Sequence, residues 1–206
     1  MKKISYLILA SITLLTACAP KTPQVSGLES TPSQSITTQQ QQAIVTKSTA
    51  IPSSFELSGG IAAKSHKKGW TATANWKQSG PNQYQISLMG PLGGQSVMIE
   101  KQNGVVSYRE GNKKLTSNNA DDLLQKQTGI RLPVSNLYYW VRGIPAPGAV
   151  QSATRNANNQ LVTLRQAGYT IDYTDYMSAG SIILPHKIRL QGHDVMVKLV
   201  IKRWAI

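Results

Sequence analysis

The fold is decided by an alternating stretch in the first half of the chain, Trp70-Thr71-Ala72-Thr73-Ala74-Asn75-Trp76. Apolar side chains occupy every second position and polar side chains lie between them, which is the pattern of a β-strand with one buried and one exposed face. The same period of two recurs over residues 83–88 and 195–201. The folded part of the chain is therefore expected to be mainly β.

Six further segments are predicted to be strands, because turn signals separate them from their neighbours. Gly80-Pro81-Asn82, Asn103-Gly104 and Ala167-Gly168 are such signals. Short connections favour antiparallel pairing, so we expect a strongly curved antiparallel sheet of nine or more strands. The six segments are Phe55–Lys64, Ser96–Gln102, Val105–Arg109, Leu161–Gln166, Tyr169–Tyr176 and Lys187–Gln191.

Two helices are predicted between the strands and are expected to pack into or over the sheet. Asn119 can cap a helix over Ala120–Thr128, which has two aspartates in its first turn and Gly129 at its end. A second helix is expected over Pro133–Arg142, because proline is favoured near a helix start and Gly143 follows the last residue.

The N-terminus has the organisation of an export signal. Lys2 and Lys3 precede an uncharged, mainly apolar stretch over Ile4–Leu15, which is too short for a transmembrane helix. Leu15-Thr16-Ala17 then precedes the single cysteine of the chain, Cys18, as in a bacterial lipobox. We expect removal of residues 1–17 and lipidation of Cys18. The alternative is an ordinary signal with an incidental cysteine.

A tether is predicted between the cysteine and one folded domain. Gln, Ser, Thr and Pro supply 20 of the 32 residues from Lys21 to Pro52, a composition that cannot form a core. As a flexible chain this segment would span roughly 30 Å, although a short helix over Gln39–Lys47 is compatible with its residues. The expected organisation is thus 1–17 signal, 18–52 lipidated cysteine and tether, and 53–206 folded domain.

The composition excludes several classes of function. One cysteine and three scattered histidines argue against a disulfide framework or a metal cage, and the chain contains no phosphate-binding loop or hydrolase motif. Asp172 and Asp175 are three positions apart in one strand segment and are expected on opposite faces. His186 and His193 are more simply interpreted as solvated. We therefore expect neither an enzyme, nor a cofactor, nor a bound metal.

The basic excess and one loop suggest surfaces for partners. Without Lys2 and Lys3 the chain has 20 basic and 9 acidic residues, a net charge of +11. For an exported, anchored protein, an acidic protein or anionic lipid fits this charge better than nucleic acid, while a solubility surface stays an alternative. The loop Met89–Gly94 carries Leu92 among small residues, and Leu92 either projects outward or folds back onto the sheet.

The combination of motifs resembles the LolB family of outer-membrane lipoprotein receptors. The resemblance rests on the lipobox, residues 76–80, Gly90-Pro91-Leu92-Gly93, residues 120–124, and Trp140-Val141-Arg142-Gly143. It implies an incompletely closed antiparallel barrel with helices as a lid. It also implies an anchored receptor on the periplasmic face of the outer membrane, which takes lipoproteins from a periplasmic carrier and inserts them among the phospholipids of the inner leaflet.

The resemblance assigns roles to particular residues. Leu92 is expected to touch the membrane, assisted by Gly90, Pro91, Gly93 and Gly94. The acyl chains of the cargo need an apolar cavity, although each proposed lining residue could equally belong to a packed core. The expected cavity residues are Trp76, Trp140, Trp204, Ala72, Ala74, Ile86 and Leu88. The expected carrier-docking residues are Lys64, Lys67, Lys68, Arg109, Lys113 and Lys114.

Two other functions stay open at this point. A structural or assembly lipoprotein could bind proteins through its curved sheet and would have a packed interior. A hydrolase of envelope lipids or glycans is a weaker alternative, since catalytic groups can be distant in sequence. We expect a monomer that binds no nucleic acid.

Overall fold

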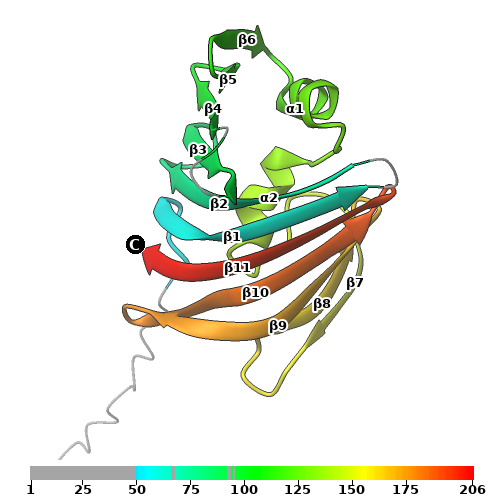
Figure 1. The fold of residues 1–206 in the computed structure, drawn as a ribbon. Helices are drawn as coiled ribbons and strands as arrows, with labels where there is room; N and C mark the ends of the chain where they lie inside the picture. The colour runs from blue at the N-terminus through cyan, green and yellow to red at the C-terminus, as the bar shows by residue number, and fades with distance from the viewer. Residues whose placement is uncertain (1–49, 66–67, 92–93, 95) are drawn as a thin grey trace, which may run out of the picture. The chain divides into compact units, whose positions relative to one another are not determined.

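In the computed structural model, residues 50–65, 68–91, 94 and 96–206 are described. The expectations for the signal, Cys18, the tether up to residue 49, Lys67, Leu92 and Gly93 lie outside these residues. The described chain forms eleven strands and two helices (Figure 1). They are β1 (Phe55–Ser65), β2 (Gly69–Gln78), β3 (Tyr84–Met89), β4 (Ser96–Gln102), β5 (Val105–Glu110), β6 (Lys113–Ser117), α1 (Ala120–Thr128), α2 (Val134–Trp140), β7 (Val150–Arg155), β8 (Leu161–Gln166), β9 (Tyr169–Ala179), β10 (Ile182–Gly192) and β11 (Val195–Ala205).

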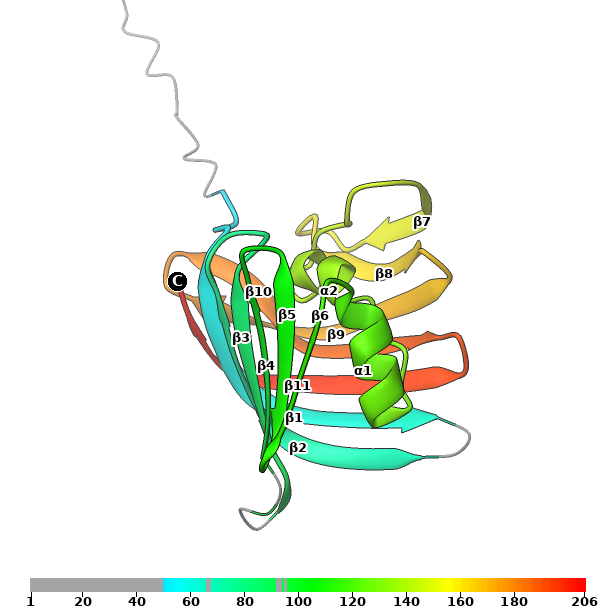
Figure 2. The same cartoon turned by 90° about the horizontal axis from the view of Figure 1, so that it is seen from above.

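All the strands belong to one antiparallel sheet with the order β6-β5-β4-β3-β2-β1-β11-β10-β9-β8-β7. Strand β1 pairs with β11, so the two ends of the folded chain meet in the middle of the sheet. The sheet curls around the helices, while its edge strands β6 and β7 do not pair with each other (Figure 2). The expected curved, incompletely closed antiparallel barrel with helices is confirmed.

Close contact between the two central strands requires a glycine. The register between β1 and β11 shifts at Ser58/Gly59. A Cβ atom on Gly59 would lie only 2.1 Å from the carbonyl oxygen of Val200. Only a residue without a side chain fits there, and the bulge increases the local bend of the sheet.

The first helix has the predicted bounds, and the second is shorter than predicted. The Asn119 side chain accepts a hydrogen bond from the Asp122 N–H at 3.1 Å, and Gly129 ends α1 in a left-handed conformation with φ 72°. Helix α2 was expected to continue to Arg142 but ends at Trp140. Beyond it, the Arg142 N–H donates to the Tyr139 carbonyl at 3.0 Å, a tighter turn than that of an α-helix.

Two strands are absent from the sequence prediction, and both lie at sheet edges. Strand β6 has a single apolar residue, Leu115, and strand β7 is exposed at every position. An edge strand with little buried surface lacks the alternation that predicts a strand. The β7 strand also has register shifts against β8, which interrupt its pairing further.

Candidate functional site: an apolar cavity and its mouth

An apolar cavity of about 100 Å³ lies between the concave face of the sheet and the two helices. Alternation along the strands points the side chains of Leu57, Ile61 and Trp76 to this face. Helix α1 contributes Leu124 and Thr128. Helix α2 and the turn after it contribute further apolar residues, Leu137, Trp140 and Val141.

Five of the seven residues expected at a cavity lie in its wall. They are Ala74, Trp76, Ile86, Leu88 and Trp140. The other two, Ala72 and Trp204, are not among the lining residues. Ala72 instead borders an outer hollow beside Met89 and Gly90.

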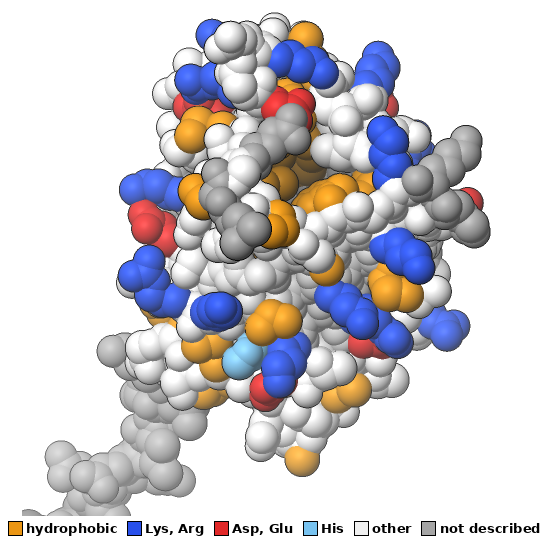
Figure 3. All heavy atoms as spheres, viewed as in Figure 1, with side chains coloured by type: hydrophobic (Ala, Val, Ile, Leu, Met, Phe, Trp, Pro, Cys, Tyr) orange, Lys and Arg blue, Asp and Glu red, His pale blue; other side chains and the backbone are white. Residues whose placement is uncertain are grey.

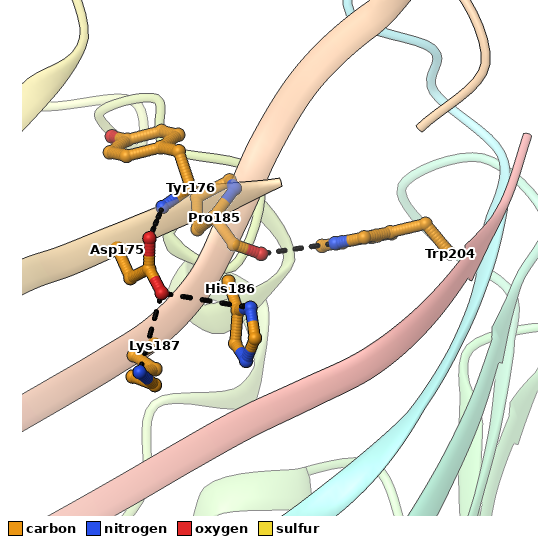
Figure 4. Close-up of polar contacts among 6 residues, drawn as sticks. All are labelled: Asp175, Tyr176, Pro185, His186, Lys187 and Trp204. Carbon is orange, nitrogen blue, oxygen red and sulfur yellow. Dashed lines mark hydrogen bonds and ion pairs between the residues drawn. The ribbon is translucent and has the colours of Figure 1, made fainter. Parts of the chain in front are cut away.

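Trp204 belongs to the packed end of the sheet rather than to the cavity wall. Its indole Nε1 donates to the Pro185 carbonyl oxygen at 3.0 Å (Figure 4). Its ring centroid lies 5.4 Å from that of Phe55, in an edge-to-face arrangement. Simple alternation from Ile201 would place Trp204 on the opposite face, but the register shift at Ser58/Gly59 turns it to the side of Leu57. The sequence shows neither this shift nor the hydrogen bond that fixes the ring away from the cavity.

Trp70 is the most informative lining residue that the cavity prediction omitted. Trp70 lines the cavity and also borders an outer hollow, and its buried Nε1 has no hydrogen-bond acceptor among the described residues. The indoles of Trp76 and Trp140, by contrast, donate to Gln78 and Gln166. Its place in the alternating stretch could have identified Trp70, since it shares a face with Ala74 and Trp76.

The cavity is small for its proposed use. A dry protein cavity of roughly 150 Å³ holds one benzene molecule. The free volume of about 100 Å³ is smaller than that. An acyl chain therefore needs more room than this free volume, so its entry requires the walls of the cavity to move apart.

The mouth lies where two strands separate. Strand β3 pairs with β2 only from Thr73 onward, so the two strands diverge beyond the pair Thr73–Met89. Figure 3 shows an opening in this face, with hydrophobic side chains inside and Lys and Arg side chains around it. Of the described residues of the expected membrane loop, Pro91 and Gly94 are exposed and Gly90 is half-buried.

The described docking candidates form two groups, and both approach α1. On the β1–β2 hairpin, the side chain of Lys68 lies next to Gly129, at 3.4 Å from a Cβ built there. On the β5–β6 hairpin, Lys113 Nζ donates to Gln127 Oε1. Arg109, a cross-strand neighbour of Lys114, is 3.2 Å from Glu100. Lys64 and Lys114 are exposed.

The carboxylates and histidines of the outer face do not form catalytic groups. Asp172 and Asp175 were expected on opposite faces, but the structure corrects this. A register shift in the β9–β10 pair lets Asp175 bind Lys187 at 3.3 Å, while Asp172 binds Arg189 at 2.9 Å. Lys187 and Arg189 are two residues apart and therefore share one face.

Each of these carboxylates is neutralised by a cation. Lys187 and the Tyr176 N–H lower the pKa of Asp175, and His186 Nδ1 lies 3.8 Å from its Oδ2 (Figure 4). His193 contacts the Ala167 carbonyl oxygen at 3.2 Å. Within residues 50–206, apart from the undescribed positions, no cluster of three metal-ligating side chains occurs.

One carboxylate is partly desolvated beneath the helices. Asp121 Oδ1 accepts the Val134 N–H at 3.0 Å and so ties the start of α2 to α1. Burial raises the pKa of this carboxyl above its ordinary value, although the Val134 hydrogen bond opposes the shift. The junction between the two helices therefore contains a carboxylate whose charged form is disfavoured.

The curved sheet, the helices over its concave face and the apolar cavity define the class of this protein, an open barrel with an apolar interior. A family model described as outer membrane lipoprotein LolB matches residues 53–204. The chain belongs to the LolB family. No helix in the described part of the chain is long and apolar enough to cross a membrane.

Individual relatives agree with this assignment. The chain is 37% identical over 153 residues to an outer-membrane lipoprotein LolB of Coxiella burnetii, covering 74% of this chain and 72% of the relative. A LolB of Pseudomonas aeruginosa is 35% identical over 151 residues, covering 73% of each chain. A LolA superfamily protein from Nitrosomonas europaea has a TM-score of 0.43 and 10% identity, covering 74% of this chain and 86% of that one. The family assignment rests on the sequence matches.

Proposed function

We propose that the protein is a lipid-anchored receptor that accepts lipoproteins from a periplasmic carrier and inserts them into the inner leaflet of the outer membrane. Membership of the LolB family carries this proposal. The cavity supports it, because its wall is almost entirely apolar and it has a mouth bordered by a loop and by cations. The signal over residues 1–17, the lipid on Cys18 and the tether up to residue 52 are parts of the same proposal.

The transfer needs no chemical step by the protein. Burial of acyl chains is favourable in proportion to the apolar area removed from water, at about 25 cal/mol per Å². Moving a chain from one apolar cavity to another, and then into a bilayer, exchanges similar environments, so the net free energy is small. The protein acts as a binding intermediate, and its docking cations serve the encounter with an acidic carrier.

A separate role is proposed for Leu92. Burying one leucine contributes about 1.5–3 kcal/mol, which suits reversible contact with the bilayer but not anchoring. The neighbours Gly90, Pro91 and Gly94, of which Pro91 and Gly94 are exposed, provide little side-chain cover at this loop. The cavity would thus hold the cargo, and the loop would help it leave.

A reconstituted assay can measure the two transfers separately with the full-length protein. We expect Leu92→Glu to leave transfer from carrier to receptor near its normal rate and to impair transfer from receptor to liposome. Raising the salt concentration should slow the first transfer only, since exposed charges are screened within about 8–10 Å. Leu92→Ile is the matched control and should behave as the unaltered protein.

The opposite results would contradict particular parts of the proposal. Normal delivery to liposomes by Leu92→Glu, or equal loss of both transfers, would remove the membrane role of the loop. A rate of transfer from carrier to receptor that does not change with salt concentration would contradict the docking role of the cations. The small free volume favours the alternative assembly role, and failure of the protein to accept any acylated cargo would support that role instead.

A further inference from the structure

Strand β2 has a free edge at the mouth of the cavity. Strand β1 pairs with β2 over Gly69–Gln78, whereas β3 pairs only from Thr73. Among the described residues, the stretch from Gly69 to Ala72 therefore has a strand neighbour on one side only. An unpaired strand edge presents main-chain donors and acceptors that another extended chain can bind.

The hairpin register shows which groups point to this edge. The Ser65 N–H donates to the Lys68 carbonyl oxygen at 2.7 Å, which closes a two-residue hairpin. In an antiparallel pair, bonded and non-bonded residue pairs alternate. Gly69 and Thr71 consequently direct their N–H and C=O groups away from β1, toward the free edge, and both residues are exposed.

Trp70 lies between these two residues and connects the edge with the cavity. Trp70 lines the cavity, and it also borders a hollow of about 690 Å³ that includes Lys68, Gly69 and Thr71 and extends over β1 to Met196 and Lys198 of β11. Its Nε1–H is buried without an acceptor among the described residues. Such a donor is costly to leave unpaired, and in a native protein it calls for an explanation.

We propose that this edge binds the main chain of the cargo segment that directly follows the acylated cysteine. The proposal rests on the proposed function, because acyl chains held in the cavity require the attached polypeptide to leave through the mouth. There, Gly69 and Thr71 pair with the extended peptide as an added strand. The Trp70 indole turns its N–H to a carbonyl oxygen of the acylated cysteine.

Main-chain pairing suits the task of such a receptor. A strand added to a sheet edge is held by hydrogen bonds that do not depend on side-chain identity. Lipoproteins share the acylated cysteine but need not share the residues after it. The edge would therefore recognise any cargo whose first residues are free to extend, and the cavity would supply the remaining affinity.

A proline substitution can test the edge without breaking the hairpin. The Thr71 N–H is not used in the β1–β2 ladder, and proline is tolerated where the N–H of an edge strand faces outward. Thr71→Pro in the full-length protein in nanodiscs removes one edge donor, while Thr71→Val keeps it. The probes are a triacylated cysteine amide without a peptide and the same group followed by four residues, with empty nanodiscs as the blank.

The expected result is selective. Thr71→Pro should weaken binding of the lipopeptide three- to tenfold, the value of about one net hydrogen bond. It should leave binding of the cysteine amide unchanged, and Thr71→Val should change neither. Trp70→Phe, which keeps an aromatic ring but removes the N–H, should weaken both probes, because both contain the carbonyl groups of the acylated cysteine.

A second series changes the ligand and leaves the protein intact. Methylation of single peptide nitrogens should weaken binding at every second residue, because alternate N–H groups of a strand face the partner edge. The edge proposal is overturned if methylation weakens binding without this alternation. It is also overturned if Thr71→Pro weakens binding of both probes equally and methylation has no effect. Failure of the unaltered protein to bind the cysteine amide contradicts the proposed function instead.

Discussion

Helix α2 is fastened to the C-terminal strands by buried hydrogen bonds, whereas helix α1 meets its neighbouring strand through a hydrogen bond at the surface. Gln166 accepts from Trp140 Nε1 at 2.9 Å, and the Tyr173 hydroxyl donates to the Trp140 carbonyl at 2.9 Å. For α1, the side-chain bond to β6 joins the exposed Lys113 to the half-buried Gln127 and lies at the surface.

The attachments of α2 extend to the beginning of the folded chain. Arg142, in the turn after α2, donates to the Pro52 carbonyl oxygen at 2.9 Å and lies 3.8 Å from the ring centroid of Tyr138. The Tyr138 hydroxyl donates to the Ser53 carbonyl oxygen at 3.0 Å. The helix thereby holds the residues directly before β1.

From this difference we expect α1, rather than α2, to be the wall that moves. Exposed hydrogen bonds contribute little net stability, whereas buried polar groups are costly to separate. Leu124 and Thr128 of α1 line the cavity of about 100 Å³. Displacement of α1 would enlarge the cavity with few buried polar groups unpaired, while α2 stays in place.

The largest expected effect tests the attachment of α2. Gln166 is 2% exposed, accepts from Trp140 Nε1 and the Ala146 N–H, and donates to the Ala146 carbonyl. Gln166→Leu leaves these partners buried and unpaired, so we expect a loss of about 3–5 kcal/mol in the free energy of unfolding. Urea denaturation of the full-length protein measures this loss.

The matched substitution lies on α1. Gln127→Leu removes the exposed bond to Lys113 and should change the free energy of unfolding by less than about 0.5 kcal/mol. Similar losses in the free energy of unfolding for Gln166→Leu and Gln127→Leu would show that the two helices are attached equally strongly. The proposed difference between α1 and α2 would then be wrong.

The next prediction concerns movement of α1. We replace Lys113 and Gln127 by cysteine and join them with a bismaleimide whose spacer contains a disulfide. Joining should slow acceptance of cargo at least tenfold, because α1 can no longer leave β6, and reduction of the spacer should restore it. Each protein is compared with its own uncoupled form, which cancels the effect of losing Lys113.

A control linkage spans the outer face of the C-terminal strands. Asp172→Cys with Arg189→Cys joins β9 and β10, whose side chains at these positions already form an ion pair of 2.9 Å. This linkage should leave acceptance unchanged. Unimpaired acceptance by the joined α1 would mean that the cavity opens elsewhere.

How far the sequence predicted the molecule depends on how local each signal is. Helix α1 was predicted with its bounds because Asn119 and Gly129 are capping residues within its own sequence. Most strands were predicted because one face is buried. Strands β6 and β7 were not, since one residue of β6 and none of β7 provides a buried face.

The site was less predictable than the fold, because it depends on pairing between distant segments. The alternation of residues 70–76 places Trp70 and Trp76 on one face, but only the three-dimensional structure shows that Trp76 Nε1 is paired and Trp70 Nε1 is not. The point where β3 leaves β2 also depends on register, which the sequences of the two strands leave open. The shift that brings Asp175 beside Lys187 is a further effect of this kind.

The smallest expected effect lies at the junction of the two helices and depends on pH. Burial raises the pKa of Asp121 above its ordinary value of 3.8. At pH values between 3.8 and the raised pKa of the folded state, the folded state binds more protons than the unfolded state. The free energy of unfolding therefore falls as the pH rises through this range. At neutral pH the charged Asp121 therefore weakens the fold, whereas well below pH 3.8 it does not.

Asp121→Asn removes this charge, while its side-chain oxygen can still accept the Val134 N–H. We expect the variant to be more stable than the unaltered protein at pH 7 and equally stable near pH 3, as measured by urea denaturation. Asp122→Asn is the control, since it removes a more exposed carboxylate from the same first turn and with it a favourable interaction with the helix dipole. This variant should be less stable at pH 7. A loss of stability for Asp121→Asn at pH 7 would contradict this prediction. It would mean that the interactions of the charged Asp121 with the helix dipole and the Val134 N–H outweigh the cost of its desolvation, so that the charge strengthens the junction between the helices.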